Sequence, residues 1–195
     1  GELIAAGKIG GYGVSEWSAA HIREAHGVTP MMAVQTEYSL WSRNPEIAVL
    51  DTCRELGITF VAFSPVARGV LANGVRDVTA LEERDLRRTM PRFNEENWPT
   101  NLALVDAFNA IAAREGVTPA QLSLGWVLAR GEHIVAIPGT ANPDHVAENI
   151  ARAGWTMPPA LLAELDVLIN RHTVAGPRYG AVMQATIDTE EYPAT

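Results

Sequence analysis

Short apolar segments alternate with amphipathic helical segments along the chain, and this alternation constrains the fold more than any other feature. The apolar segments cover residues 9–14, 32–35, 58–63 and 134–137, and each is apolar on both of its faces. Such runs are typical of strands buried on both sides in a parallel sheet, where helices form the connections. The sequence therefore predicts an α/β protein built from βα units.

Helix start and stop signals separate the predicted strands. Asn-Pro and Thr-Pro pairs place a capping residue before a proline in the first turn, and glycines mark the ends. Thr118 and Gln121 have the spacing of a capping box. The predicted helices cover residues 18–27, 44–57, 100–116, 118–131 and 142–154, with a last helix after 158–159. Between them, residues 69–99 form a long irregular segment with charges of both signs, which predicts either a binding loop or a solvated surface segment.

Composition narrows the class of protein. The 195 residues are 47% hydrophobic, which is typical of a soluble globular protein. The sequence has no uncharged apolar run of 18 residues, so it predicts no membrane span. The net charge of −8, from 23 acidic and 15 basic residues, argues against nucleic acid or an anionic membrane as partner. The only cysteine, Cys53, excludes an internal disulfide and a cysteine metal cluster, which indicates a reducing, cytoplasmic location.

Several common chemistries lack their motifs. No glycine-rich dinucleotide or P-loop motif follows a predicted strand, and no HExxH or GxSxG pattern occurs. We therefore expect neither a metal site nor a hydrolase nucleophile. The only lysine, Lys8, precedes a strand, at the end opposite to the active face of a barrel, which argues against Schiff-base chemistry.

Small polar residues follow each predicted strand, at 15–16, 35–37, 64–65 and 139–142. In a (β/α) barrel these strand ends build the active face, although the same residues also favour ordinary turns. Glu16 and Glu37 lie there and are candidates for an acid–base pair or for polar turn contacts. His145 lies in the first turn of the helix after the fourth strand, where free N–H groups and the helix dipole favour phosphate binding.

Five segments occur in an order that resembles the aldo-keto reductase family. They are GKIGGYGVSEWS, AVQTEYSLWSR, GITFVAFSPVARGVL, DLRRTMPRFNEEN and IPGTANPDHVAENI, and together they cover almost the entire chain. The fourth is similar to the branch of perakine and pyridoxal reductases. The resemblance implies a (β/α)8 TIM barrel, of which this chain holds the last four βα units plus a C-terminal helix and tail. It also implies hydride transfer between NADPH and a carbonyl.

The resemblance assigns a cofactor role to residues at every strand end. Ser15 and Gln35 would bind the nicotinamide carboxamide, and Glu16 stands where the family usually has asparagine. Phe63 would stack on the nicotinamide ring. The residues that would wrap the pyrophosphate are Ser64, Val66, Arg68 and Gly69. Those expected around the adenosine are Gly139, Thr140, Ala141, His145, Glu148 and Asn149. The resemblance implies NADP as cofactor. Because residues 140–145 hold no lysine or arginine to bind its 2′-phosphate, NAD is also possible.

The catalytic Asp, Tyr, Lys and His of the family come from its first four βα units, and none has a counterpart here. The resemblance therefore assigns residues 1–195 to the C-terminal, cofactor-binding half of a reductase barrel, without catalytic residues and inactive in isolation. The expected partner of the full-length parent is a small-molecule aldehyde or ketone. The alternatives are a non-catalytic half-barrel, either self-associating or complemented by an N-terminal half, and a phosphate-binding barrel that is not a reductase.

Overall fold

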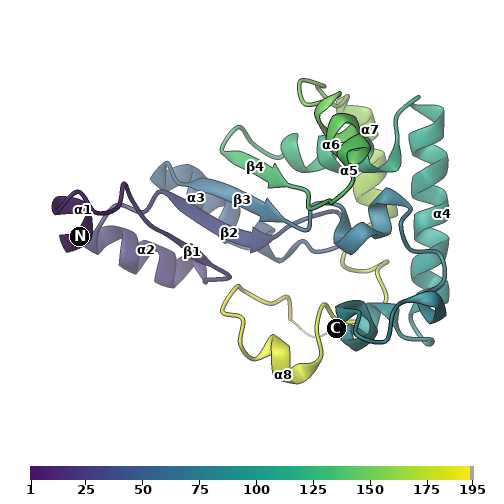
Figure 1. The fold of residues 1–195 in the computed structure, drawn as a ribbon, viewed down its shortest axis with the longest axis horizontal. Coiled ribbons are helices and arrows are strands. Elements are labelled where there is room, and N and C mark those ends of the chain that lie inside the picture. The colour runs from purple at the N-terminus through teal and green to yellow at the C-terminus, as the bar shows by residue number, and fades with distance from the viewer. Residues whose placement is uncertain (194–195) are drawn as a thin grey trace.

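Three consecutive parallel pairings join four strands into one sheet in the computed structural model, which describes residues 1–193. The strands are β1 (Gly13–Ser15), β2 (Ala33–Glu37), β3 (Thr59–Phe63) and β4 (Ile134–Ile137), in the order β1-β2-β3-β4. Ser15 pairs with Gln35 and Gln35 with Val61, so the carboxyl ends of the strands meet at one edge of the sheet (Figure 1). The predicted α/β class is confirmed.

The first strand is shorter than the predicted segment 9–14. Gly10 and Gly11 lie in the part that is not strand, and glycine is depleted in strands because it has no side chain to pack. A Cβ atom at Gly11 would lie 1.8 Å from the sulfur of Met32. A side chain at this position would therefore displace the flexible Met32 side chain.

Only one face of the sheet is covered. Val34, Phe60 and Ala62 have no exposed surface, whereas Val135 and Ile137 on the other face are about 45% exposed. Successive strand residues point to opposite faces, so the helices cover one face and leave the other open. The expectation that these strands are buried on both sides was wrong. Within residues 1–193, β1 and β4 each pair with one neighbour only, and their outer edges are free.

The helices of the described chain are α1 (Glu2–Ala5), α2 (Ala19–Val28), α3 (Val49–Leu56), α4 (Trp98–Arg114), α5 (Pro119–Leu128), α6 (Pro143–Ile150), α7 (Pro159–Leu168) and α8 (Ala181–Gln184). Among them, α3 packs against β3 and α5 against β4, whereas α4 and α8 lie away from the sheet (Figure 1). Five short 3-10 turns complete the described chain, namely η1 (Asn44–Glu46), η2 (Ala67–Ala72), η3 (Val78–Ala80), η4 (Leu86–Thr89) and η5 (Pro91–Phe93). None of the helices within residues 1–193 has the length and apolarity needed to cross a bilayer.

Several predicted helix boundaries were wrong. Asn44 and Pro45 open the 3-10 turn η1, and α3 starts only at Val49. Gly57 ends α3 as predicted, with a left-handed φ of 68° that glycine adopts without steric cost. In α2 the helix continues through Gly27, and α5 ends before Gly131. The long irregular segment contains the short turns η2 to η5, and many of its residues are exposed, as predicted for a surface segment.

The indole of Trp126 on α5 joins three parts of the core. Its ring lies 5.4 Å from that of Tyr38, and the guanidinium groups of Arg130 and Arg43 lie over it at 4.1 and 5.0 Å. Asp166 of α7 accepts hydrogen bonds from Trp126 Nε1 at 3.1 Å and from Arg43 at 2.9 Å. A charged and aromatic cluster therefore fixes α5 and α7 against the segment that follows β2.

We predict that the capping box contributes measurably to stability. Thr118 Oγ1 accepts a hydrogen bond from the Gln121 amide at 3.2 Å, and Gln121 Oε1 accepts one from the Thr118 amide. Thr118→Ala should lower the free energy of unfolding by about 1 kcal/mol in urea titrations, because it leaves the Gln121 amide without its side-chain acceptor. Thr118→Ser is the control and should retain most of the stability. Equal losses in both variants would contradict the assigned role of the hydroxyl.

Candidate functional site

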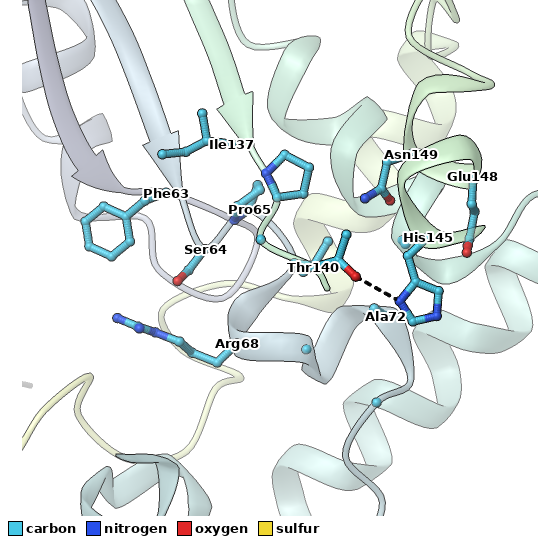
Figure 2. A pocket seen from close by; sticks show the side chains of 16 residues that line it. Phe63, Ser64, Pro65, Arg68, Ala72, Ile137, Thr140, His145, Glu148 and Asn149 are labelled. Carbon is cyan, nitrogen blue, oxygen red and sulfur yellow. Dashed lines mark hydrogen bonds between the residues drawn. The ribbon is translucent and has the colours of Figure 1, made fainter. Parts of the chain in front are cut away.

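A cavity of about 490 Å³ opens at the carboxyl ends of β3 and β4 (Figure 2). Its walls come from the loop between β3 and η2, from the segment after β4 and from α6. Phe63 and Arg68 lie at one end, and His145, Glu148 and Asn149 lie at the other (Figure 2). The cavity is therefore elongated, with an aromatic and cationic end and a helix N-terminus at the far end.

The structure brings together ten of the fourteen predicted site residues. Those lining the cavity are Phe63, Ser64, Val66, Arg68, Gly69, Gly139, Thr140, His145, Glu148 and Asn149. Ser15, Glu16, Gln35 and Ala141 lie outside its lining; Ser15 and Glu16 are at the end of β1, and Gln35 is in the middle of β2. The prediction missed Pro65, Ala72, Gly74, Ala120, Ile137 and Pro138. Pro65, Ile137 and Pro138 adjoin predicted site residues, whereas Ala120 reaches the cavity from α5 and carries no sequence signal.

The loop after β3 has an unusual backbone. Ser64, Ala67 and Arg68 have left-handed φ angles of 50°, 51° and 57°, and Gly69 has 91°. Non-glycine residues rarely adopt this conformation and do so only where the surroundings hold them. Ser123 of α5 donates a hydrogen bond to the Pro65 carbonyl at 2.7 Å, which anchors the loop to a helix. The polar backbone of the loop is thus held in place at the cavity before any ligand binds.

The far end of the cavity is the start of α6. Asn142 Oδ1 accepts a hydrogen bond from the Asp144 amide at 3.0 Å, and this confirms the predicted helix start. Thr140 Oγ1 accepts from the Asn142 amide at 3.1 Å and lies 3.3 Å from Nδ1 of His145 (Figure 2). A hydroxyl, an imidazole and the positive end of a helix dipole converge here, which is an arrangement suited to a phosphate group.

A buried charge network lies at the other end. The Arg68 guanidinium is 5.5 Å from the Phe63 ring and donates hydrogen bonds to Glu37 at 2.9 Å and to the Tyr179 hydroxyl at 2.7 Å. Arg178 lies 5.7 Å from the same ring and contacts Glu37 at 3.2 Å. Two cations therefore flank Phe63, and both contact the carboxylate of Glu37.

Glu16 completes this network. Both of its carboxylate oxygens accept hydrogen bonds from Arg178, at 2.6 and 2.9 Å, and Oε1 also accepts one from the Glu37 amide at 3.0 Å. Its φ of 59° turns the chain sharply after β1. The two carboxylates expected as an acid–base pair are thus each bound to arginine, and this geometry favours ion pairing over proton transfer.

The ionisation of Glu37 follows from this geometry. Its side chain is 3% exposed, and burial alone raises the pKa of a carboxyl group. The charges of Arg178 and Arg68, together with hydrogen bonds from Ser42 and Arg68, outweigh burial and lower the pKa of Glu37 below its ordinary value of 4.5. Glu37 is therefore a carboxylate at neutral pH and holds the two arginines in place.

Residues 178–192, here called the C-terminal strap, pass below the strand ends (Figure 1). Asp188 accepts hydrogen bonds from the Ser18 amide at 2.8 Å and from the Ser18 hydroxyl at 2.7 Å, and lies 2.6 Å from His21 Nδ1. Glu190 accepts from the Ala19 amide at 2.7 Å. Ser18 is at the predicted cap position of α2, but its side chain makes no cap hydrogen bond. The strap supplies the caps instead.

Among the residues that the structure describes, no three His, Cys, Asp or Glu side chains are grouped so that they could hold a metal ion. The thiol of Cys53 is buried in the core and plays no part in the site. Burial raises its pKa to about 12, so it is an inert thiol at neutral pH.

Comparison with known proteins gives matches over most of the chain. The sequence profile of the aldo/keto reductase family matches residues 1–169. A curated relative, the aldo-keto reductase Str7 of Strobilurus tenacellus, is 37% identical over 98% of this chain. The chain spans only 58% of the length of that relative.

Two solved structures have a similar fold. The glycerol dehydrogenase AKR11B4 from Gluconobacter oxydans superimposes on 90% of this chain with a TM-score of 0.81 and 27% identity, and 53% of that protein is covered. The thermostable aldo-keto reductase Tm1743, in complex with the inhibitor epalrestat, superimposes on 86% with a TM-score of 0.61 and 27% identity, and 51% of it is covered. The parallel sheet and its helices are thus shared with these enzymes.

We predict that Glu37 makes stability dependent on pH. Because its pKa is lowered on folding, its stabilisation is complete above pH 4.5 and is lost as the pH falls through the lower folded value. Glu37→Gln should cost about 3 kcal/mol at pH 7, since it leaves buried arginines without their carboxylate. Chemical unfolding from pH 3 to 7 should also give a flatter profile than the wild type. The exposed Glu83→Gln is the control, and a matching loss there would contradict the assignment.

We predict a second pH dependence at the strap. The hydrogen bond and charge of Asp188 raise the pKa of His21 above 6.5, and hydrogen bonds from Ser18 and His21 lower the pKa of Asp188 to about 2. The contact is therefore complete between about pH 4 and 6.5, weakens as the pH rises through the folded pKa of His21, and is lost near pH 2. Hydrogen exchange of residues 186–190, corrected for intrinsic rates, should follow this profile. His21→Asn should remove the upper step, and Ser18→Ala should retain it at lower protection.

Proposed function

Because the chain belongs to the aldo/keto reductase family, we propose that it forms the nicotinamide dinucleotide site of an oxidoreductase that reduces an aldehyde or ketone to an alcohol. The observation that carries this proposal is the elongated cavity at the ends of β3 and β4. One wall holds an aromatic ring, a turn of left-handed backbone and a helix N-terminus in sequence. A dinucleotide has the same succession of planar ring, pyrophosphate and nucleoside.

The ring end suits a nicotinamide. Phe63 is only partly buried, and a planar ligand stacks favourably on an aromatic ring. Ser15, the last residue of β1, pairs with Gln35 in the middle of β2, and a hydroxyl and an amide placed side by side can bind a carboxamide. We assign Glu16 a positioning role instead, because its carboxylate already binds Arg178.

The phosphate end suits the remainder of the ligand. The backbone of residues 64–69 and the guanidinium of Arg68 would hold the pyrophosphate, and the α6 N-terminus with Thr140 and His145 would hold a 2′-phosphate. Glu148 and Asn149 would contact the adenine. We propose NADP as cofactor. Discrimination against NAD should be weak, since no lysine or arginine occurs in residues 139–149 to bind the 2′-phosphate.

The bound cofactor supplies the hydride, and the residues of this chain orient its ring against the carbonyl. The alcohol also needs a proton. The Tyr179 hydroxyl accepts a hydrogen bond from Arg68 at the ring end, but burial and the charge of Glu37 raise its pKa, and it donates to Glu37. We therefore propose that the proton donor lies outside these 195 residues and that the chain alone does not turn over.

The same proposal accounts for the uncovered side of the sheet. The open face, with Val135 and Ile137, and the free edges of β1 and β4 are where four further βα units would close an eight-stranded barrel. An assembly module, in which two such halves pair or one binds a separate N-terminal half, is the second candidate, and the same free edges favour it. A stable dimer in native mass spectrometry would support this second function.

We predict that the isolated chain binds NADPH through Phe63. Titration monitored by nicotinamide fluorescence should give saturable binding, and Phe63→Ala should weaken it about tenfold because the stacking surface is lost. Binding of 2′,5′-ADP, which has no nicotinamide, should be unchanged in the same variant. His145→Ala should weaken NADPH more than NADH.

The control for these titrations is Leu86→Ala, an exposed side chain outside the cavity. Absence of NADPH binding, or an equal loss of 2′,5′-ADP affinity in Phe63→Ala, would contradict the cofactor site. Reduction of an aldehyde by the isolated chain would contradict the external proton donor.

A further inference from the structure

A second cavity, of about 240 Å³, lies between the segment after β2 and the C-terminal strap. It shares no lining residue with the nucleotide cavity. Four arginines line it, which are Arg43, Arg92, Arg171 and Arg178. We infer that this cavity binds a small oxyanion, carried by a carboxylate or phosphate group.

Two of the four arginines already have carboxylate partners. Arg43 pairs with Glu46 and Asp166, both at 2.9 Å, and Arg178 pairs with Glu16 at 2.6 Å. Arg92 and Arg171 have no carboxylate within 4.0 Å among residues 1–193. The cavity is therefore lined by two guanidinium groups that form no ion pair in the described structure.

Arg92 has its free donors at the cavity. Its Nη1 donates to the Trp41 carbonyl at 2.6 Å and to Ser42 Oγ at 2.9 Å, and its Nε donates to the Gly176 carbonyl at 3.2 Å. Its Nη2 has no acceptor among the described residues. These neutral acceptors orient the guanidinium without neutralising it, and the two N–H groups of Nη2 are the donors left for an oxyanion.

The indole of Trp41 is a second, independent indication of a ligand. Trp41 lines the cavity and is 5% exposed, yet its Nε1 has no hydrogen-bond partner in the described structure. A buried indole N–H normally has an acceptor, and leaving it without one is costly. A ligand with oxygen acceptors in the cavity would satisfy it.

Glu191 also lines the cavity and adds one negative charge, but it forms no ion pair with Arg92 or Arg171 within 4.0 Å in the described structure. Its oxygens accept hydrogen bonds from Asn44, at 3.0 Å, and from Gln184. Burial lowers the pKa of Arg92 to about 10, with Glu37 opposing and Arg178 adding to the effect. Arg92 is therefore still a cation at neutral pH, and its missing counter-ion is a cost that a bound anion removes.

The test is an NMR titration of the isotope-labelled 195-residue chain with inorganic phosphate and, separately, with malonate, at constant ionic strength. Trp41→Phe identifies the indole N–H signal of Trp41 among the five tryptophans. That signal should shift saturably with a Kd of about 1 mM or tighter for at least one anion. The anion that binds identifies the group as phosphate or carboxylate.

Arg171→Gln should weaken this binding about tenfold, because it removes one uncompensated charge at an exposed position where folding is not at risk. Arg84→Gln makes the same charge change at an exposed site outside the cavity and should bind like the wild type. No saturable shift below about 10 mM, or identical titrations in the two variants, would overturn the site. NADPH binding is read from other residues, so its success or failure leaves this test independent.

Discussion

The site depends on one buried ion network. Glu37, 3% exposed at the end of β2, binds Arg68 from the loop after β3 and Arg178 from the C-terminal strap, and Arg178 in turn binds Glu16 after β1. Removing any one partner leaves a charge in a poorly solvated place, so the groups stabilise only as a set. The network therefore joins three strand ends to a segment about 140 residues away and determines what lies around Phe63.

The two cavities are related through this network. Arg68 lines the larger cavity at the ends of β3 and β4, and Arg178 lines the smaller arginine-lined cavity. Glu37 forms ion pairs with both arginines. The larger cavity includes a loop already held in left-handed backbone conformations at Ser64, Arg68 and Gly69, whereas the second cavity is lined mainly by side chains of the segment after β2 and of the strap. The first is consistent with a preformed site, because its donors need no rearrangement when a ligand binds.

The sequence predicted helix-cap hydrogen bonds correctly where the donor and the acceptor are close neighbours in the chain. The Thr118–Gln121 capping box and the Asn142 cap of α6 are interactions over two or three residues, and the structure has both. The prediction that Ser18 caps α2 was wrong. Asp188 and Glu190, from the other end of the chain, accept the hydrogen bonds of the amides at the start of this helix. The predicted first strand was longer than β1 because the pattern of apolar residues carries no information on tertiary contacts such as that of Gly11 with Met32.

By itself, the sequence determined the parallel α/β class, the polar strand ends and the family, since periodicity, turn chemistry and motif order are local properties of the chain. Most of the predicted cofactor residues line one cavity for the same reason, because they lie directly after β3 and β4. The tertiary structure alone decided that Glu16 and Glu37 are ion-paired, that only one face of the sheet is covered, and that Arg92 and Trp41 share a cavity. Each of these depends on residues distant in sequence, whose proximity and charge balance are settled only when the chain packs.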